Sequence, residues 1–208
     1  MRKFSLDYAD QETDFQEVDK TVETHLENIV PKRFWGSRIG MYETGINDVV
    51  KSFCLDNSGQ VFILSGNIGT GKTTLAFGAM YERAYNGLDT GEYLSARMLC
   101  PLLLSKPSFT SPESEYDFLV RMGKVPFLVY DEAGKADDKD IEWNFLTKIL
   151  ALRHDNMLNT FIITNMDLAA FSAFIKKYGN GDDIYTRLKT NLITRSLQGP
   201  CRRKEIVA

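Results

Sequence analysis

One run of residues in the chain has the types and spacing that bind a phosphate chain. Residues 66–73 match the pattern G-x-x-x-x-G-K-[ST], between an apolar run at 61–64 and a helical stripe that begins at Leu75. Glycines let backbone N–H groups converge on phosphate oxygens, and a helix start adds its positive dipole end. We therefore predict a nucleoside triphosphate site. The residues expected to form it are Gly66, Asn67, Ile68, Gly69, Thr70, Gly71, Lys72, Thr73 and Thr74.

Two side chains of this segment would act directly on a bound nucleotide. The Lys72 ammonium would reach the β- and γ-phosphates and stabilise their charge, and the Thr73 hydroxyl would coordinate Mg²⁺. We therefore expect ATP and Mg²⁺ as cofactors, with Lys72 as a catalytic residue and Thr73 as a metal ligand.

An acidic pair follows a second apolar run. Asp131 and Glu132 come directly after residues 127–130, so both are expected at the carboxyl end of a buried strand, where α/β sheets bind ligands. Asp131 would hold Mg²⁺ through water, and Glu132 would orient and deprotonate an attacking water. The glutamate favours ATP hydrolysis over phosphoryl transfer to a small molecule, which needs no water-activating base.

A third polar position ends another apolar strand. Asn165 follows residues 160–164, and its amide could hydrogen-bond the attacking water or the γ-phosphate. Asparagine is also frequent in turns, so a purely structural role is the alternative. The order of the three motifs along the chain favours the functional interpretation and makes Asn165 a candidate catalytic residue.

Apolar segments of strand length alternate with helical stripes along the chain. This alternation is typical of a parallel sheet covered on both faces, so the expected fold class is α/β. Residues 105–116, rich in Ser and Pro, are expected to form an exposed loop. Strands are expected at 61–64, 92–96, 127–130, 160–164 and 192–194, and helices after the phosphate loop, over 141–152 and over 168–175.

The N-terminal region differs from the rest in charge and patterning. Residues 13–30 place apolar side chains three or four apart, which predicts a helix with one apolar stripe. This helix either packs on its own domain or docks a partner protein. We divide the chain into an acidic N-terminal helical segment (1–30), a linker (31–44) and a core (45–208) with a short basic C-terminal segment.

The composition is that of a globular protein with one domain. The chain has 208 residues, of which 43% are hydrophobic and 25% charged, and no apolar stretch approaches the length of a membrane helix. Its three cysteines are widely spaced and no secretory signal is visible, so we expect a reducing, cytoplasmic setting. The net charge of −3 hides a balance of −5 over residues 1–30 and +5 over residues 185–208. Such opposed ends are typical of an interaction tail and an anion-binding region.

The order of phosphate loop, Asp-Glu pair, strand-end Asn and basic C-terminal segment resembles the AAA+ ATPases. Within them, the sequence is similar to bacterial replicative helicase loaders (DnaC-like) and to IstB-like transposition ATPases. The resemblance implies a P-loop NTPase fold of the AAA+ type, a three-layer sandwich with a central, mostly parallel five-stranded sheet. It covers about residues 29–208, and the segments that support it at the subfamily level are 29–34, 149–153, 159–165, 185–188 and 199–203.

The resemblance also implies roles for individual residues. Asn165 matches the family's sensor 1 position, and Arg203 or the adjacent Arg202 matches the sensor 2 arginine that reads the γ-phosphate. Arg187 is the best match to the arginine finger that reaches a neighbouring subunit's ATP, with a solvated helix arginine as the alternative. The sequence departs from typical loaders in its short N-terminal region and in its Asp-Glu pair, where many loaders have Asp-Asp.

By this resemblance the chain is expected to hydrolyse ATP in nucleic-acid machinery, first of all as a DNA replication helicase loader of phage or bacterial type. The implied partners are a replicative helicase or transposase held by the acidic N-terminal segment, single-stranded DNA, and further copies of the chain on ATP binding, without a membrane. Possible DNA contacts are Lys135, Lys139, Phe109 and Tyr116, each with plain surface as the alternative. The alternative functions are an IstB-like transposition helper ATPase, a small-molecule P-loop kinase and a nucleotide-dependent adaptor.

Overall fold

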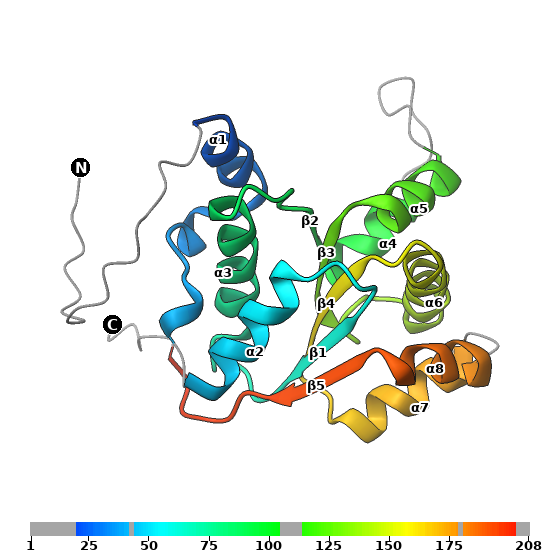
Figure 1. Cartoon of the computed structure of the whole chain (residues 1–208). Coiled ribbons are helices and arrows are strands. Elements are labelled where there is room, and N and C mark those ends of the chain that lie inside the picture. The colour runs from blue at the N-terminus through cyan, green and yellow to red at the C-terminus, as the bar shows by residue number, and fades with distance from the viewer. Residues whose placement is uncertain (1–19, 42–43, 105–113, 179–180, 203–208) are drawn as a thin grey trace, which may run out of the picture.

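The computed structural model describes residues 20–41, 44–104, 114–178 and 181–202, and five strands form a sheet in its interior. The strand order is β2-β3-β4-β1-β5, and every pairing in it is parallel (Figure 1). The five predicted strands are thus confirmed. Their bounds are β1 Val61–Ser65, β2 Glu92–Ser95, β3 Phe127–Ala133, β4 Asn159–Thr164 and β5 Leu192–Ser196.

Helices cover both faces of the sheet, which gives the three-layer α/β sandwich that the sequence predicts (Figure 1). Helices α1 to α3 pack on one face, and α4 to α8 pack on the other. No helix of the described ranges has the length and apolar character needed to span a membrane. The helices are α1 Lys20–Ile29, α2 Thr44–Leu55, α3 Lys72–Tyr85, α4 Ala96–Leu104, α5 Glu115–Lys124, α6 Lys139–Asp155, α7 Leu168–Tyr178 and α8 Gly181–Thr190.

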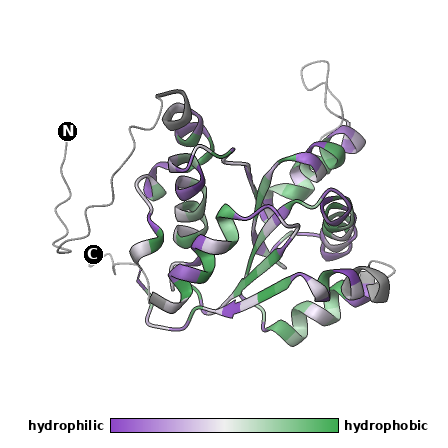
Figure 2. Ribbon diagram, viewed as in Figure 1, coloured by the Kyte–Doolittle hydropathy of each residue, from purple (hydrophilic) through white to green (hydrophobic). Residues whose placement is uncertain are grey.

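The inner strands are buried on both faces. In β1, Val61 and Ile63 belong to the core under α4 to α8, whereas Phe62 and Leu64 belong to the core under α1 to α3. Successive side chains of a strand point to opposite faces, so a strand covered on both sides needs apolar residues without a break. This explains the continuous apolar runs in the sequence, which Figure 2 shows as hydrophobic colour along the strands.

The helix α1 packs on its own domain. Leu26 and Val30 are each 1% exposed and lie in the same core cluster as α3. Two short 3-10 helices follow, η1 (Lys32–Phe34) and η2 (Ile39–Met41), and Ile39 joins that core. The described part of the predicted stripe over residues 13–30 is therefore covered within the chain. Residues 1–19, which carry most of the acidic charge, lie outside the described residues.

Four helices are absent from the sequence-based expectation, namely α2, α4, α5 and α8. The predicted exposed loop over 105–116 is wrong at its end, because α5 begins at Glu115. Ser114 caps this helix: its hydroxyl accepts a hydrogen bond from the backbone N–H of Asp117 at 3.1 Å. Residues 105–113 of that loop lie outside the described residues.

A buried arginine ties together elements at the end of the sheet away from the acidic pair. Arg153 of α6 is 1% exposed, and its Nε donates to the Thr160 hydroxyl at 2.8 Å. Its remaining nitrogens donate to the carbonyls of Met122, Val125 and Asn159. Burial lowers the pKa of Arg153 to about 9, which reflects the cost of holding this charge in the interior.

Candidate nucleotide-binding site

The phosphate loop joins β1 to α3, as the sequence predicts. Its glycines are needed by the backbone: Gly66 has φ of +140°, Gly69 of +82° and Gly71, which precedes the first residue of α3, of +100°. A Cβ atom on Gly66 would lie 2.3 Å from the carbonyl oxygen of Leu197. These three positions therefore favour glycine, and at Gly66 the C-terminal segment packs directly against the loop.

The Lys72 side chain folds back over the loop. Its Nζ donates to the carbonyl oxygens of Gly66 and Asn67, both at 2.7 Å, and the residue is 6% exposed. The Thr70 hydroxyl donates to the same Asn67 carbonyl at 3.0 Å. The ammonium group is thus held beside the loop carbonyls, near the position that the β- and γ-phosphates take in a phosphate loop.

Asp131 and Thr73 meet beside the start of α3. The Thr73 hydroxyl donates to Asp131 Oδ2 at 2.9 Å, and the Tyr93 hydroxyl donates to the same oxygen at 3.1 Å. Burial raises the pKa of the Asp131 carboxyl, while the hydrogen bonds from Thr73, the Glu132 N–H and Tyr93 act in the opposite direction. A hydroxyl and a carboxylate are oxygen ligands of the kind that Mg²⁺ prefers, so the donor set fits this metal.

Glu132 reaches the same cavity through an unusual backbone conformation. Consecutive residues of a regular strand face opposite sides of the sheet, yet Asp131 and Glu132 both line one cavity. Glu132 has φ of +58°, in the left-handed region, and the pairing of β3 with β4 shifts between Tyr130 and Ala133. Such a bulge redirects a side chain, and here it brings both acids to the same place.

The Glu132 carboxylate already has two partners. Its Oε2 accepts hydrogen bonds from the Ser95 hydroxyl at 3.1 Å and from Arg97 Nε at 3.0 Å. Ser95 ends β2 and Arg97 lies in the first turn of α4, so the neighbouring strand holds the glutamate from one side. In this arrangement one carboxylate oxygen of Glu132 is occupied by the protein.

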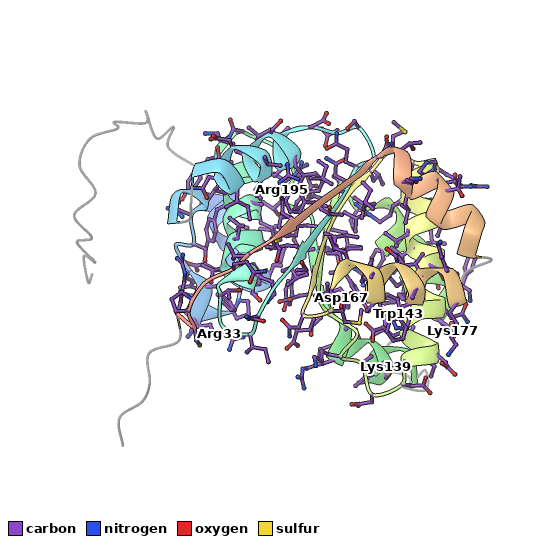
Figure 3. The ribbon with its side chains drawn as sticks, turned by 90° about the horizontal axis from the view of Figure 1, so that it is seen from below. Arg33, Lys139, Trp143, Asp167, Lys177 and Arg195 are labelled. Carbon is purple, nitrogen blue, oxygen red and sulfur yellow. The ribbon has the colours of Figure 1, made fainter. Side chains whose placement is uncertain are left out.

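A cavity of about 760 Å³ collects these groups. Its lining contains five basic side chains against two acidic ones, which complements a triphosphate that binds together with a divalent cation. Arg33, one of the five, lies on the side of the sheet opposite Lys139 and Asp167 (Figure 3). The lining residues are Arg33, Phe34, Ile68, Gly69, Gly71, Lys72, Thr73, Thr74, Tyr93, Arg97, Asp131, Glu132, Lys135, Ile163, Thr164, Asn165 and Arg202.

Two further predicted residues lie at this cavity. Asn165 follows β4 and lines it beside Thr164, whose hydroxyl donates to the Ala133 carbonyl at 3.0 Å. Arg202 also lines it, and its backbone N–H donates to the Gly69 carbonyl of the phosphate loop at 2.8 Å. The C-terminal segment is therefore attached to the phosphate loop at this point. Arg203 lies outside the described residues.

Arg187 is not among the residues that line the cavity. It lies on α8, is exposed, and its Nη1 is 3.4 Å from Asp155 Oδ1 of α6. The structure therefore separates this candidate from the other predicted site residues of the same chain. Of the possible DNA contacts, Lys135 lines the nucleotide cavity, Tyr116 is 72% exposed on α5, and Phe109 lies outside the described residues.

The sequence analysis missed the contribution of β2 to the site. Tyr93 and Ser95 of β2, together with Arg97 at the start of α4, contact the two acids. Tyr93 and Ser95 alternate within a segment already expected to form a strand. Polar residues two apart at the carboxyl end of a strand were the available signal, because such residues share a face. Arg33 and Phe34 were noted only for the family resemblance, and their place in the cavity depends on how η1 packs against α3.

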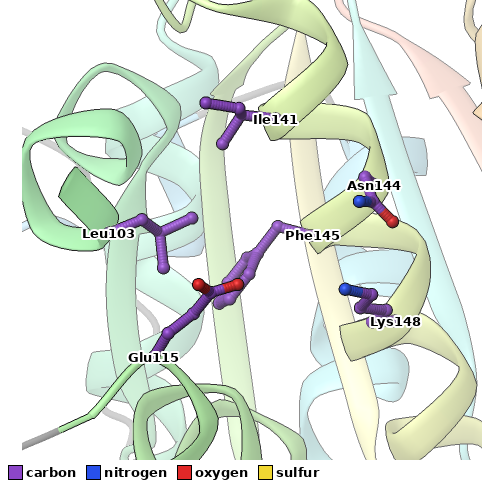
Figure 4. A pocket seen from close by; sticks show the side chains of 6 residues that line it. All are labelled: Leu103, Glu115, Ile141, Asn144, Phe145 and Lys148. Carbon is purple, nitrogen blue, oxygen red and sulfur yellow. The ribbon is translucent and has the colours of Figure 1, made fainter.

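A second, smaller hollow lies between α4, α5 and α6 (Figure 4). Its volume is about 140 Å³, and Glu115, Asn144 and Lys148 are its polar lining residues, beside the apolar Leu103, Ile141 and Phe145. The phosphate loop lies elsewhere, so the larger cavity is the candidate nucleotide site.

Comparisons with known proteins identify the class of fold. No family model matches the sequence, and no curated protein matches it. The solved DnaC helicase loader matches with a TM-score of 0.63 and 19% identity, over 81% of this chain and all of the other (100%). DnaI matches with a TM-score of 0.64 and 19% identity, over 86% of this chain and 100% of the other. The replication initiator DnaA bound to AMPPCP and single-stranded DNA matches with a TM-score of 0.58 and 14% identity, over 79% of this chain and 50% of the other.

The fold is therefore that of the AAA+ P-loop NTPases. Within this class the chain shares its fold with the DnaC helicase loader and DnaI, each matched over its whole solved length. The resemblance seen in the sequence is confirmed at the level of the fold.

Proposed function

We propose that the protein binds ATP with Mg²⁺ and hydrolyses it. The observation that carries this proposal is the shared position of Asp131 and Glu132, which a bulge brings to one cavity with Lys72 and Thr73. A metal-binding acid and a water-activating acid at the end of one strand, facing a phosphate loop, are the groups that hydrolysis of a triphosphate requires.

Each residue then has a defined task. Thr73 and Asp131 would hold Mg²⁺, which when bound supplies positive charge to the phosphate oxygens. The Lys72 ammonium would give up its hydrogen bonds to the Gly66 and Asn67 carbonyls and donate to phosphate oxygens instead. Glu132 would orient a water and take its proton, and Asn165 and Arg202 would contact the γ-phosphate.

We further propose that the protein is a DNA replication helicase loader of phage or bacterial type. Its fold is shared with a DnaC helicase loader, with DnaI and with a DnaA initiator bound to single-stranded DNA, which supports this choice. The partners would be a replicative helicase or a transposase, held by the acidic segment 1–30, single-stranded DNA, and other copies of the chain. The position of Arg187 away from its own cavity suits a role at a neighbour's site. We place the protein in the cytoplasm.

One observation favours a second candidate, a nucleotide-dependent adaptor with slow turnover. Arg97 and Ser95 occupy an oxygen of Glu132, so hydrolysis would be slow until these contacts break. In the loader hypothesis DNA or the partner helicase breaks them. In the adaptor hypothesis the ATP-bound form persists and is itself the signal.

The test measures steady-state ATP hydrolysis by the purified protein, alone and with single-stranded DNA. The loader hypothesis predicts stimulation of several-fold by DNA, which Lys72→Ala and Glu132→Gln both abolish. ATP binding without stimulated turnover supports the adaptor. Transfer of phosphate to a metabolite would instead identify a kinase.

A further inference from the structure

The bulge that redirects Glu132 must be stabilised, because a left-handed backbone is unfavourable for a side chain of this size. Without the bulge, Glu132 would face the same side of the sheet as Tyr130, which packs in the core beneath α6. Two hydrogen bonds hold the bulged segment in place. The Lys135 N–H donates to the Glu132 carbonyl at 2.9 Å, and the Thr164 hydroxyl donates to the Ala133 carbonyl at 3.0 Å.

A third group, the carboxylate of Glu142, contacts the chain on both sides of the bulge. Its Oε1 accepts hydrogen bonds from the Tyr130 hydroxyl at 3.2 Å and from the Gly134 N–H at 2.6 Å. Its Oε2 accepts the Ala136 N–H at 3.1 Å. Tyr130 precedes the bulge and Gly134 directly follows β3, so one side chain fixes both ends of the segment that contains Glu132.

Glu142 is itself 0% exposed, on the first turns of α6. Burial of a carboxylate costs free energy, and an apolar side chain of similar volume often fills such a place without loss of stability. The start of the helix and the three hydrogen bonds offset this cost. A carboxylate at this position is explained by what it holds, namely the two backbone N–H groups of the loop after β3.

We propose that Glu142 is a positioning residue for Glu132 and acts through the backbone of residues 133–136. Loss of its carboxylate lets the bulge relax and turns Glu132 away from the cavity, while the phosphate loop on β1 keeps its form. This inference deepens the proposed hydrolytic function and rests on it.

Glu142→Gln is the decisive variant. The glutamine keeps the size of the side chain but offers one acceptor oxygen, so either Gly134 or Ala136 loses its partner and faces an NH₂ group. We expect kcat for ATP hydrolysis to fall at least about tenfold, since a general base contributes about 10²–10⁴-fold. The affinity for ATP should stay within about twofold, because the phosphate loop is not changed.

Thr147→Val is the matched control on the same helix. Thr147 is 2% exposed, and its hydroxyl donates to the carbonyls of Trp143 and Asn144 within α6. This variant should lose stability to a similar degree and keep kcat. Tyr130→Phe removes only the hydroxyl bond to Glu142 and should give a smaller fall in kcat than Glu142→Gln.

Amide hydrogen exchange and backbone chemical shifts by NMR report the positioning without any turnover. In Glu142→Gln the amides of Gly134 and Ala136 should lose protection, and the shifts of Glu132 should leave their left-handed values. If the wild-type protein does not hydrolyse ATP, the proposed function fails, and these signals still decide the positioning. The inference is overturned if Glu132 keeps its shifts in Glu142→Gln, or if kcat falls no further than in Thr147→Val.

Discussion

Arg97 Nε lies 3.0 Å from Glu132 Oε2, and the Ser95 hydroxyl contacts the same oxygen at 3.1 Å. The residue proposed to activate water is therefore bound by the neighbouring strand and helix in this structure. The ion pair is partly exposed, with 62% of the Arg97 side chain and 39% of the Glu132 side chain accessible to solvent. Such a pair contributes little to stability, about 0–1 kcal/mol. Removal of the Arg97 side chain should therefore leave the fold intact, so a change in kcat can be assigned to Glu132.

The first prediction concerns this pair. Arg97→Ala should raise kcat in the absence of DNA by about threefold or more, because the Glu132 oxygen becomes available to water. The melting temperature should change little. Arg121→Ala, which removes the surface pair with Glu92, is the matched control and should leave kcat unchanged. A lower kcat for Arg97→Ala would show that this arginine assists the reaction.

The second prediction concerns the acid at the metal position. Burial raises the pKa of the Asp131 carboxyl from its ordinary value of 3.8, so the folded state holds this proton more tightly than the unfolded chain. Its contribution to stability is therefore greatest below that value and is lost as the pH rises through the folded pKa. The side chain introduced by Asp131→Asn cannot ionise. We therefore expect the variant to have a higher melting temperature than the wild type at about pH 7, with a difference that shrinks toward about pH 4.

Thermal unfolding without nucleotide or Mg²⁺ measures this difference. The control is Asp155→Asn, because Asp155 has 61% of its side chain exposed. A melting temperature for Asp131→Asn below that of the wild type at both pH values would contradict the prediction.

The third prediction concerns the buried arginine of α6. Arg153→Met keeps an apolar stem but leaves the carbonyls of Met122, Val125 and Asn159 without this donor. We expect a loss of about 3 kcal/mol in the free energy of unfolding, because each buried acceptor without a partner costs about 1–3 kcal/mol. Urea denaturation measures the loss, and a change below about 1 kcal/mol would mean that the site repacks.

The fourth prediction tests whether Arg187 acts on a neighbouring subunit. Arg187→Ala and Glu132→Gln should each lower kcat at least about tenfold. An equal mixture should recover about a quarter of the wild-type rate, because half of the sites keep Glu132 and half of their neighbours keep Arg187 in a head-to-tail assembly. No recovery in the mixture would place Arg187 outside the reaction.

Local patterns in the sequence were sufficient to predict the strands of the sheet and the position of the phosphate loop. Continuous apolar runs predicted the inner strands β1, β3 and β4, since strands covered on both faces are mostly apolar. The edge strands β2 and β5 contain polar residues and were predicted from weaker, shorter patterns. The helix α2 was missed although Ile46, Val49 and Phe53 have helical spacing. The helix α4 starts one residue after β2 and contains Pro101, so neither a turn nor an unbroken helical segment marks it.

The details of the candidate site depend on contacts between distant residues. The left-handed backbone of Glu132 follows from the register of β3 against β4, and its partners come from β2 and α4. Glu142 is one turn into an amphipathic helix, where a glutamate is normally expected to face solvent. Glu142 is buried because α6 packs against the loop after β3, a contact that local sequence patterns do not predict.

The central claim is that the cavity hydrolyses ATP through Glu132. The most direct measurement compares steady-state ATP hydrolysis and ATP binding for the wild type, Glu132→Gln and Lys72→Ala in the presence of Mg²⁺ and single-stranded DNA. We predict that the wild type turns over, that Glu132→Gln binds ATP without turning it over, and that Lys72→Ala loses both. Turnover by Glu132→Gln at the wild-type rate, with ATP bound as tightly, would contradict the claim.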